Sequence, residues 1–188
     1  MNSFFNQTDH RPWEMPQANC SMYQHWHDLL FAHWPMDAKV LSALIPDSLL
    51  LDTFDGQAWI GVVPFWMSGI RGRGFPAVPY LSQFPEINVR TYVTDGEKAG
   101  VWFFSLDAAN RIAVHVARKY FCLPYYHAQM ECLLNENHVE YSSKRIHANM
   151  PAAEFQGNYA PVDEVQIAQK GSLEYWLAER YCLYTTNP

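Results

Sequence analysis

The residues of this chain whose types and spacing best suit chemistry lie in the segment FPEINVRTY, where Glu86, Asn88 and Arg90 occupy every second position. Successive side chains of a strand point to opposite faces, so these three share one face and Ile87 and Val89 share the other. Glu86 and Arg90 are then about 13 Å apart along the strand, too far to pair directly, which leaves space for a ligand between them. The same alternation is typical of an ordinary solvated strand, so both interpretations stay open. We expect the three polar side chains to point inward.

A second candidate lies in the glycine-rich segment from residue 68 to residue 82, which contains Arg71 and Arg73. Gly72 and Gly74 would let the backbone approach a ligand closely, and a guanidinium binds a carboxylate through two parallel hydrogen bonds. A solvated surface loop has the same composition. The segment matches neither a P-loop nor a dinucleotide-binding glycine motif.

Metal and nucleophile chemistry find little support in the sequence. His127, Gln129 and Glu131 alternate along one predicted strand, but one histidine and one carboxylate do not make a zinc site. No Gly-x-Ser-x-Gly nucleophile elbow is present. We therefore expect no metal and no cofactor. The four cysteines form no Cys-x-x-Cys pair and are expected to be free, mostly buried thiols: Cys20, Cys122, Cys132 and Cys182.

Composition excludes several classes of protein. The 188 residues include 13 Lys and Arg against 19 Asp and Glu, a net charge of −6 with no basic run, so nucleic acid is not expected as a partner. The most apolar stretch, Ala58–Met67, is too short to cross a membrane as a helix. The N-terminus lacks the pattern of a secretory signal, so a cytoplasmic protein without a membrane partner is expected. Apolar residues make up 49% of the chain, enough for one domain, residues 1–188, with a single core.

Four segments are predicted to be helical. Apolar residues recur at helical spacing from Trp26 to Trp34, where Pro35 would end the helix. Asp37 is expected to cap a second helix with Val40, Leu41 and Leu44 on its buried face. Asp107 is expected to cap a third helix that runs to about Phe121, with Ile112, Val116 and Tyr120 on one face. Ser172 is expected to cap a short helix, Leu173–Ala178.

Three hairpins are predicted from apolar runs separated by turn residues. Asp55-Gly56 would join Leu49–Phe54 to Ala58–Met67, Asp95-Gly96 would join Glu86–Thr94 to Ala99–Ser105, and Asn135–His138 would join His127–Leu134 to Val139–Ile146. The first twenty or so residues are expected to be irregular, Ser68–Ser82 a loop, Pro151–Ala168 a loop with one short strand, and Arg180–Thr185 a strand. This order favours an α+β fold whose mainly antiparallel sheet curls or closes into a barrel. A C-terminal hairpin is expected to be missing after the last strand.

Six segments carry a resemblance to a known family: HWHDLLFAHWPM, LLLDTFDGQAWIGVVPFWMSGIRGRG, FPEINVRTYV, GVWFFSLDAAN, ARKYFCLPYYHAQM and GSLEYWLAERYCLY. They resemble the YqjF-like proteins, a bacterial family labelled as being of unknown function, over about residues 25–185. That family in turn resembles acetoacetate decarboxylase. The resemblance implies an antiparallel, cone-shaped β-barrel with a central cavity and helices packed on the outside.

The resemblance does not carry the decarboxylase reaction with it. Acetoacetate decarboxylase forms a Schiff base on a lysine whose pKa is lowered by a second lysine beside it. The matching place here, after Pro124, holds Tyr125 and Tyr126, and tyrosine cannot form an imine. Lys119 lies nearby on the predicted helix and is expected to extend into solvent. Glu86 and Arg90 are comparable with the carboxylates and the arginine that line the decarboxylase barrel.

Three functions remain open from the sequence. The first is a pocket protein for an anionic or oxygenated metabolite, without a Schiff-base lysine. Its ligand-binding residues would be Arg71, Arg73, Glu86, Asn88, Arg90, Tyr125 and Tyr126. The second is a lyase or isomerase that uses Glu86 as base and a tyrosine as acid. The third is a structural or interaction protein whose barrel is filled by its own side chains. A homo-oligomer is compatible with all three.

Overall fold

The computed structural model describes residues 8–79 and 81–186, and within them the chain forms ten strands and three helices. The strands are β1 (Met22–His27), β2 (Ala32–Met36), β3 (Leu50–Leu51), β4 (Ala58–Gly72), β5 (Phe84–Thr94), β6 (Ala99–Ala108), β7 (Tyr125–Asn135), β8 (His138–Arg145), β9 (Glu154–Tyr159) and β10 (Leu183–Tyr184). The helices are α1 (Ala38–Ser42), α2 (Arg111–Phe121) and α3 (Leu173–Ala178). None of the described helices is long and apolar enough to span a membrane.

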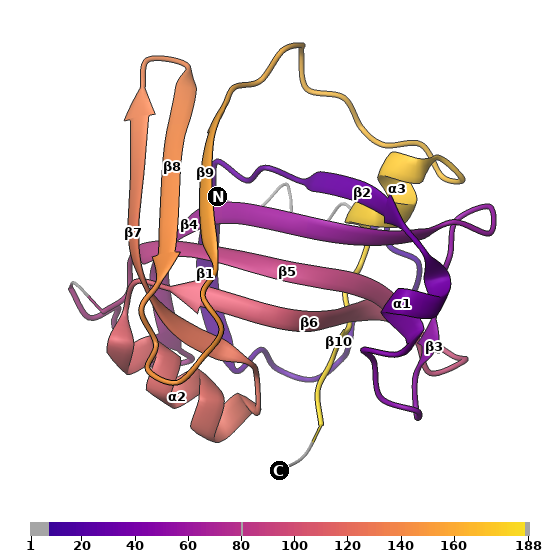
Figure 1. The fold of residues 1–188 in the computed structure, drawn as a ribbon, viewed down its shortest axis with the longest axis horizontal. Helices are drawn as coiled ribbons and strands as arrows, with labels where there is room; N and C mark the ends of the chain where they lie inside the picture. The colour runs from indigo at the N-terminus through magenta and orange to yellow at the C-terminus, as the bar shows by residue number, and fades with distance from the viewer. Residues whose placement is uncertain (1–7, 80, 187–188) are drawn as a thin grey trace.

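The long strands β4, β5 and β6 form the centre of the molecule, each antiparallel to the next (Figure 1). The other edge of β4 is shared by two short strands: β2 pairs with its first half and β1 with its second half. The free edge of β6 is also shared, because β10 pairs with Val101 and Trp102 whereas β7 pairs with its last three residues. Both of these contacts on β6 are parallel.

A second group of strands, β7–β8–β9, crosses the first at a steep angle (Figure 1). α2 connects β6 to β7, which pairs with β6 only over Tyr125–His127 and then continues as the first strand of the crossing group. This arrangement gives the β4–β5–β6 sheet two covered faces. α2 packs on one of them, and β8 and β9 pack on the other.

The core is correspondingly divided into two clusters. One lies on the α2 side and includes Val63, Phe65 and Val114, and the other includes Ile87 and Tyr141. Ile87 therefore faces away from Glu86, as the alternation predicts. The resemblance implies helices on the outside of the sheet, but strands β8 and β9 cover the face that bears Ile87.

The prediction of a largely antiparallel sheet accompanied by a few helices is confirmed, since the described residues are mostly sheet with three helices. A closed cone-shaped barrel is not confirmed: among the described residues the hydrogen-bonded order runs from β1 to β9 without returning to β1.

The predicted helix from Trp26 to Trp34 is wrong. β1 and β2 occupy this segment, separated by a turn at Asp28, whose φ is +52°. Nearly every residue of β1 is exposed because the strand lies at a sheet edge. An edge strand that is exposed on both faces needs no alternation of apolar and polar residues. The apolar residues of this segment therefore carry no strand pattern, and their incidental spacing predicts a helix instead.

The caps were predicted with mixed success. Asp37 caps α1 by accepting a hydrogen bond from the Lys39 amide, and Ser172 caps α3 in the same way. Of the face predicted for α1, only Leu41 is buried, whereas Val40 and Leu44 are exposed. The prediction that Asp107 caps the third helix is wrong. Asn110 caps α2, since its Oδ1 accepts from the amides of residues 112 and 113, and Asp107 belongs to β6.

The first and last predicted strands also needed correction. Asp55 and Gly56 both adopt positive φ, as a tight turn requires, but β3 pairs with β5 rather than with β4. The segment from Ser68 to Gly72 continues β4 and is not a loop. The strand predicted for Arg180–Thr185 is reduced to β10, and β9 is the short strand expected within Pro151–Ala168. The four cysteines are free thiols; Cys20 is exposed, so its predicted burial is wrong, and the other three are half-buried.

Candidate functional site

A cavity of about 480 Å³ lies between α2 and the face of the sheet formed by β1, β4, β5 and β6. Most of its wall is apolar. The side chains of Trp26, Ile112 and Val116 line the cavity and yet remain exposed, so it opens to solvent beside α2. The polar side chains in its wall are Gln24, Glu86, Asn88, Arg90 and Tyr125. A few convergent polar groups in a mainly apolar cavity are typical of a small-molecule site.

Strand geometry places the polar row on the cavity face. Phe65 and Val63 of β4 lie directly opposite Glu86 and Asn88, and cross-strand partners share a face. On β6 a bulge between Phe103 and Leu106 shifts the register, so both of these side chains face the cavity although they are three residues apart. The bulge therefore adds an aromatic wall beside the polar row.

Glu86 forms one end of this row. Its side chain is buried, with 3% of the residue exposed, and its Oε2 accepts a hydrogen bond of 2.7 Å from the Tyr125 hydroxyl. Burial raises the pKa of Glu86 to about 8; the Tyr125 hydrogen bond lowers this pKa, and the Asp107 carboxylate raises it further. Desolvation is the dominant cause, because a charged carboxylate loses most of its hydration in this wall. Glu86 is therefore mainly a neutral carboxylic acid at pH 7.

Arg90 forms the other end of the row and is 8% exposed. Its guanidinium lies 5.2 Å from the centre of the Phe31 ring and 5.7 Å from that of Tyr92. Among residues 8–79 and 81–186, no carboxylate lies within ion-pairing distance of this guanidinium, and its Nε has no hydrogen-bond partner. The cavity thus contains a buried cation to which the described part of the chain supplies no counter-ion.

The groups around Arg90 do not neutralise it. His33 approaches the Tyr92 hydroxyl to 2.5 Å, and burial together with the Arg90 charge lowers the pKa of His33 to about 4. His33 is therefore neutral at pH 7. The Arg180 guanidinium also lies over the Tyr92 ring, 5.1 Å from its centre, but it is paired with Asp52 at 2.6 Å. Among the described residues that line the cavity, Arg90 is the one positive charge at this end.

Asn88 lies between Glu86 and Arg90 and is 5% exposed. Its Oδ1 is buried and has no hydrogen-bond partner in the described part of the chain. A buried carbonyl oxygen without a hydrogen-bond partner costs about 1–3 kcal/mol of stability. A donor group on a ligand, reached by a rotation of the Asn88 amide, would remove this cost.

Three residues predicted from the sequence lie outside the cavity. Arg71 donates to the Gly69 carbonyl and stacks over the Tyr23 ring, and Arg73 is exposed in the turn after β4. Tyr126 points to the opposite side of β7, where its ring contacts the Arg145 guanidinium at 4.3 Å. The structure brings together Glu86, Asn88, Arg90 and Tyr125, and leaves out Arg71, Arg73 and Tyr126.

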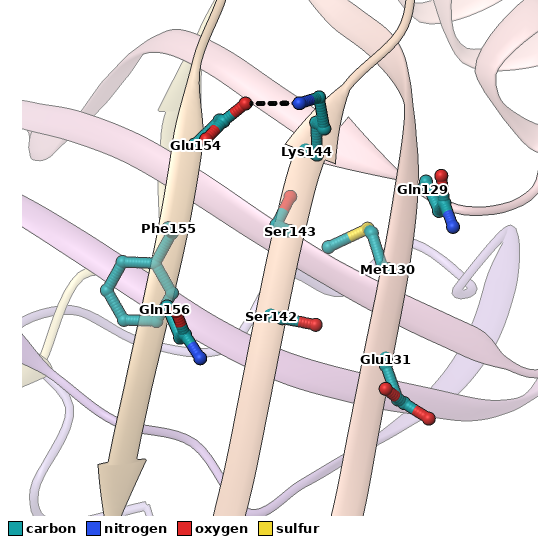
Figure 2. Close-up of a pocket in the computed structure, with 9 residues that line it drawn as sticks. All are labelled: Gln129, Met130, Glu131, Ser142, Ser143, Lys144, Glu154, Phe155 and Gln156. Atoms are coloured by element: carbon teal, nitrogen blue, oxygen red, sulfur yellow. Dashed lines mark ion pairs between the residues drawn. The ribbon is translucent and has the colours of Figure 1, made fainter.

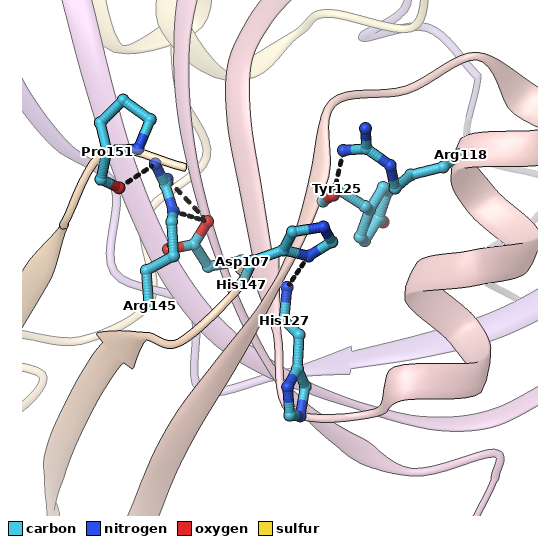
Figure 3. Close-up of polar contacts among 7 residues, drawn as sticks. All are labelled: Asp107, Arg118, Tyr125, His127, Arg145, His147 and Pro151. Carbon is cyan, nitrogen blue, oxygen red and sulfur yellow. Dashed lines mark hydrogen bonds and ion pairs between the residues drawn. The ribbon is translucent and has the colours of Figure 1, made fainter. Parts of the chain in front are cut away.

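A polar cluster behind the cavity holds the start of β7 in place (Figure 3). Arg118 of α2 donates to the Tyr125 carbonyl at 2.8 Å, and the His127 amide donates to His147 Nδ1 at 3.1 Å. Arg145 forms an ion pair of 2.7 Å with the buried Asp107 of β6. These contacts fix the backbone of Tyr125, and hence the direction from which its hydroxyl reaches Glu86.

A second hollow, of about 540 Å³, lies on β7–β8–β9 (Figure 2). Lys144 and Glu154 form an ion pair of 2.7 Å there, but each of the two side chains is 64% exposed. Glu131, Gln129 and Gln156 are exposed as well. Exposed charges are screened by water and bind ligands weakly. The cavity beneath α2 is the better candidate because its polar groups are buried.

Sequence reasoning missed the wall contributed by Trp26 and Phe31, because this segment was assigned to a helix. The available signal was in FAHWPM, where Phe31 and His33 occupy alternate positions and would share one face of a strand. The sequence also predicts that Ile112 and Val116 share one face of α2, but it does not show that this face lines a cavity rather than a filled core.

The family assignment follows from comparison with known proteins. The model of DUF2071, described as an uncharacterized conserved protein, matches residues 23–188. The chain belongs to the DUF2071 family. It is also 48% identical over 172 residues to the uncharacterized protein YqjF of Bacillus subtilis, and this match covers 92% of the chain and 70% of YqjF. The predicted resemblance to YqjF-like proteins is confirmed.

Solved structures add a likeness of fold. The acetoacetate decarboxylase of Legionella pneumophila superposes with a TM-score of 0.53 at 11% identity, covering 77% of this chain and 54% of that one. An acetoacetate decarboxylase-like enzyme from Sphingomonas wittichii gives a TM-score of 0.52 at 16% identity, covering 72% and 59%. The chain thus spans little more than half the length of these structures. At such identities the likeness shows the acetoacetate decarboxylase fold and not the reaction.

The cavity differs chemically from a Schiff-base site. All five lysines lie in the described residues, and none of them lines the cavity. Lys119 is exposed on α2, where its ammonium lies 5.5 Å from the Tyr120 ring. Tyr125, at the place predicted for the nucleophile, has its pKa raised well above 10, chiefly by burial and also by Glu86. It is a hydrogen-bond donor at neutral pH.

Proposed function

We propose that this DUF2071 protein binds a small organic anion in the cavity beneath α2. The observation that carries the proposal is Arg90, a buried guanidinium in the cavity wall with no carboxylate partner among the described residues. An uncompensated buried charge costs several kcal/mol. A bound carboxylate would supply the missing counter-ion and accept hydrogen bonds from the guanidinium.

The proposed binding site is smaller than the set expected from the sequence. It consists of Arg90 as the anion partner, Asn88 beside it, and the Glu86–Tyr125 pair at the other end. The apolar walls would receive the carbon skeleton of the ligand. The likeness to acetoacetate decarboxylase-like structures supports a ligand cavity at this place, since the chain shares their fold.

Calorimetric titration with a panel of small monocarboxylates tests this proposal. We expect at least one acid to bind, and Arg90→Met to weaken its binding at least tenfold while the protein stays folded. Arg71→Met is the matched control, because it removes an arginine that does not line the cavity. Equal binding to wild type and Arg90→Met, or no binding by any member of the panel, would contradict the proposal.

One observation favours a second candidate, an acid–base enzyme of the lyase or isomerase class. The pKa of Glu86 is raised to about 8 within the cavity, close to the working pH that general acid–base catalysis needs, and Tyr125 is hydrogen-bonded to it. Incubation of a bound acid in D₂O tests this candidate. Exchange of a carbon-bound hydrogen that Glu86→Gln abolishes would favour the enzyme, whereas no exchange would leave a binding protein.

The third possibility, a structural protein filled by its own side chains, fits the geometry less well. A filled interior would leave no cavity, whereas about 480 Å³ lies open beside Arg90. It would also leave a buried cation with no role.

A further inference from the structure

We propose that the ligand is an elongated monocarboxylic acid with a second oxygen, a hydroxyl or a carbonyl, at the far end of an apolar body. This inference rests on the proposed anion site and specifies what else the ligand must carry. Arg90 would hold the carboxylate, and Glu86 with Tyr125 would hold the distal oxygen.

The spacing of the polar groups carries the first step. Glu86 and Arg90 are four residues apart on the uninterrupted strand β5, so their Cα atoms are separated by about 13 Å. Both side chains face the same cavity. A ligand of two or three carbons would reach only one of them. A ligand that contacts both must have its two polar ends separated by several carbon atoms.

The walls between the two ends carry the second step. Val63, Phe65, Leu106 and Phe103 surround the polar row, and of the row itself only Asn88 lies between Glu86 and Arg90. A sugar acid or a tricarboxylate would bury several polar groups against this apolar surface without hydrogen bonds. The middle of the ligand is therefore apolar, such as an aromatic ring or a short aliphatic chain.

The Glu86 end carries the third step. The Tyr125 hydroxyl already donates to Glu86 Oε2, so a neutral Glu86 carboxyl has its own proton to donate into the cavity. None of the described residues that line this end carries a positive charge, so it does not suit a second carboxylate. An uncharged oxygen that accepts a hydrogen bond suits it. The two ends thus select a monoanion with one neutral oxygen.

Three phenylpropanoid probes separate the two contacts: 3-(4-hydroxyphenyl)propionate, 3-phenylpropionate and 3-(4-hydroxyphenyl)propanol. The first carries both polar ends, the second lacks the distal hydroxyl and the third lacks the carboxylate. At pH 6.5 we expect the hydroxylated acid to bind roughly tenfold more tightly than 3-phenylpropionate, the effect of one buried hydrogen bond. We expect the alcohol to bind more weakly than either acid.

Substitutions assign each contact to its residue. Glu86→Met removes the polar partner at similar volume and should abolish the preference for the hydroxylated acid. Glu86→Gln keeps a neutral donor and acceptor and should retain the preference. Arg90→Met should weaken the binding of both acids by the same factor. Glu131→Met, which removes an exposed carboxylate of β7, is the control and should change neither affinity.

The outcomes distinguish this inference from the proposal beneath it. Equal affinities for the two acids in wild type, or a preference that survives Glu86→Met, would overturn the elongated ligand while leaving the anion site intact. Acid affinities unchanged by Arg90→Met would overturn both. If Glu86→Met does not fold, the structure of the wild-type complex decides: a phenolic oxygen beyond hydrogen-bonding distance of Glu86 would overturn the inference.

Discussion

At the scale of single residues, burial decides what Glu86, Asn88 and Arg90 can do, and that burial comes from elements packed over β5. The alternation of Glu86, Asn88 and Arg90 is the same for a solvated strand and for a cavity wall. What decides between them is the cover supplied by α2 and by the link between β1 and β2, which are remote in sequence from β5. The perturbed pKa of Glu86 arises from that cover and could not be predicted from neighbouring residues.

Glu86 gives the stability of the protein a specific pH dependence. Its pKa rises from 4.5 in the unfolded chain to about 8 in the native state, so the native state binds more protons between these values. The contribution of Glu86 is fully favourable below about pH 4.5 and is lost as the pH rises to about 8. The loss is on the order of 5 kcal/mol.

Glu86→Gln removes this titration and keeps a neutral acceptor for Tyr125. Urea unfolding at pH 5.5 and pH 8.5 should therefore show a smaller fall in the free energy of unfolding for the variant than for wild type. All other titrating groups are common to both proteins. An equal fall in the two proteins would show that Glu86 does not titrate with a raised pKa.

At the scale of elements, local sequence patterns predict two hairpins correctly. The same patterns fail for strands that depend on a distant partner. The β5–β6 and β7–β8 hairpins are set by turn residues and apolar runs that lie close together in sequence. By contrast, β1, β2 and β10 are short edge strands whose partners are 22 or more residues away along the chain. Their sequences carry little signal of their own.

The docking of β10 on β6 depends on a glycine. A Cβ at Gly100 would lie 2.6 Å from the Cys182 carbonyl oxygen and 2.8 Å from the Tyr184 ring, so only glycine fits. Gly100→Ala should lower stability by about 1–3 kcal/mol and loosen the segment from α3 to β10, which contributes Leu183 to the cavity. Amide exchange of Val101, which donates to the Cys182 carbonyl, measures this loosening.

Gly72→Ala is the control, because a Cβ there meets only the Phe75 ring at an ordinary 3.5 Å. If Gly100→Ala matches wild type in stability and in exchange of the Val101 amide, the close approach of β10 is not what the structure indicates.

At the scale of the whole molecule, the sequence predicts the α+β class but not how the two groups of strands cross. Their angle depends on β7 leaving β6 after three paired residues, and on contacts between residues far apart in the chain. Among these is the ion pair between Asp107 and Arg145, whose side chains are only 6% and 9% exposed. It joins β6 to β8 at the point where the two groups of strands diverge (Figure 3).

This pair allows the junction to be tested. Arg145 donates to both oxygens of Asp107 and to the Pro151 carbonyl, so Arg145→Met leaves a buried carboxylate without its cation. We expect a loss of about 3–5 kcal/mol in the free energy of unfolding.

The double variant Asp107→Leu/Arg145→Met removes both charges and should recover part of this loss. Lys144→Met, which breaks the exposed pair with Glu154, should cost less than about 1 kcal/mol. Urea unfolding of wild type, Asp107→Leu, Arg145→Met and the double variant gives the coupling energy. A coupling near zero would mean that the crossing is held not by this ion pair but by apolar contacts such as those of Ile87 and Tyr141.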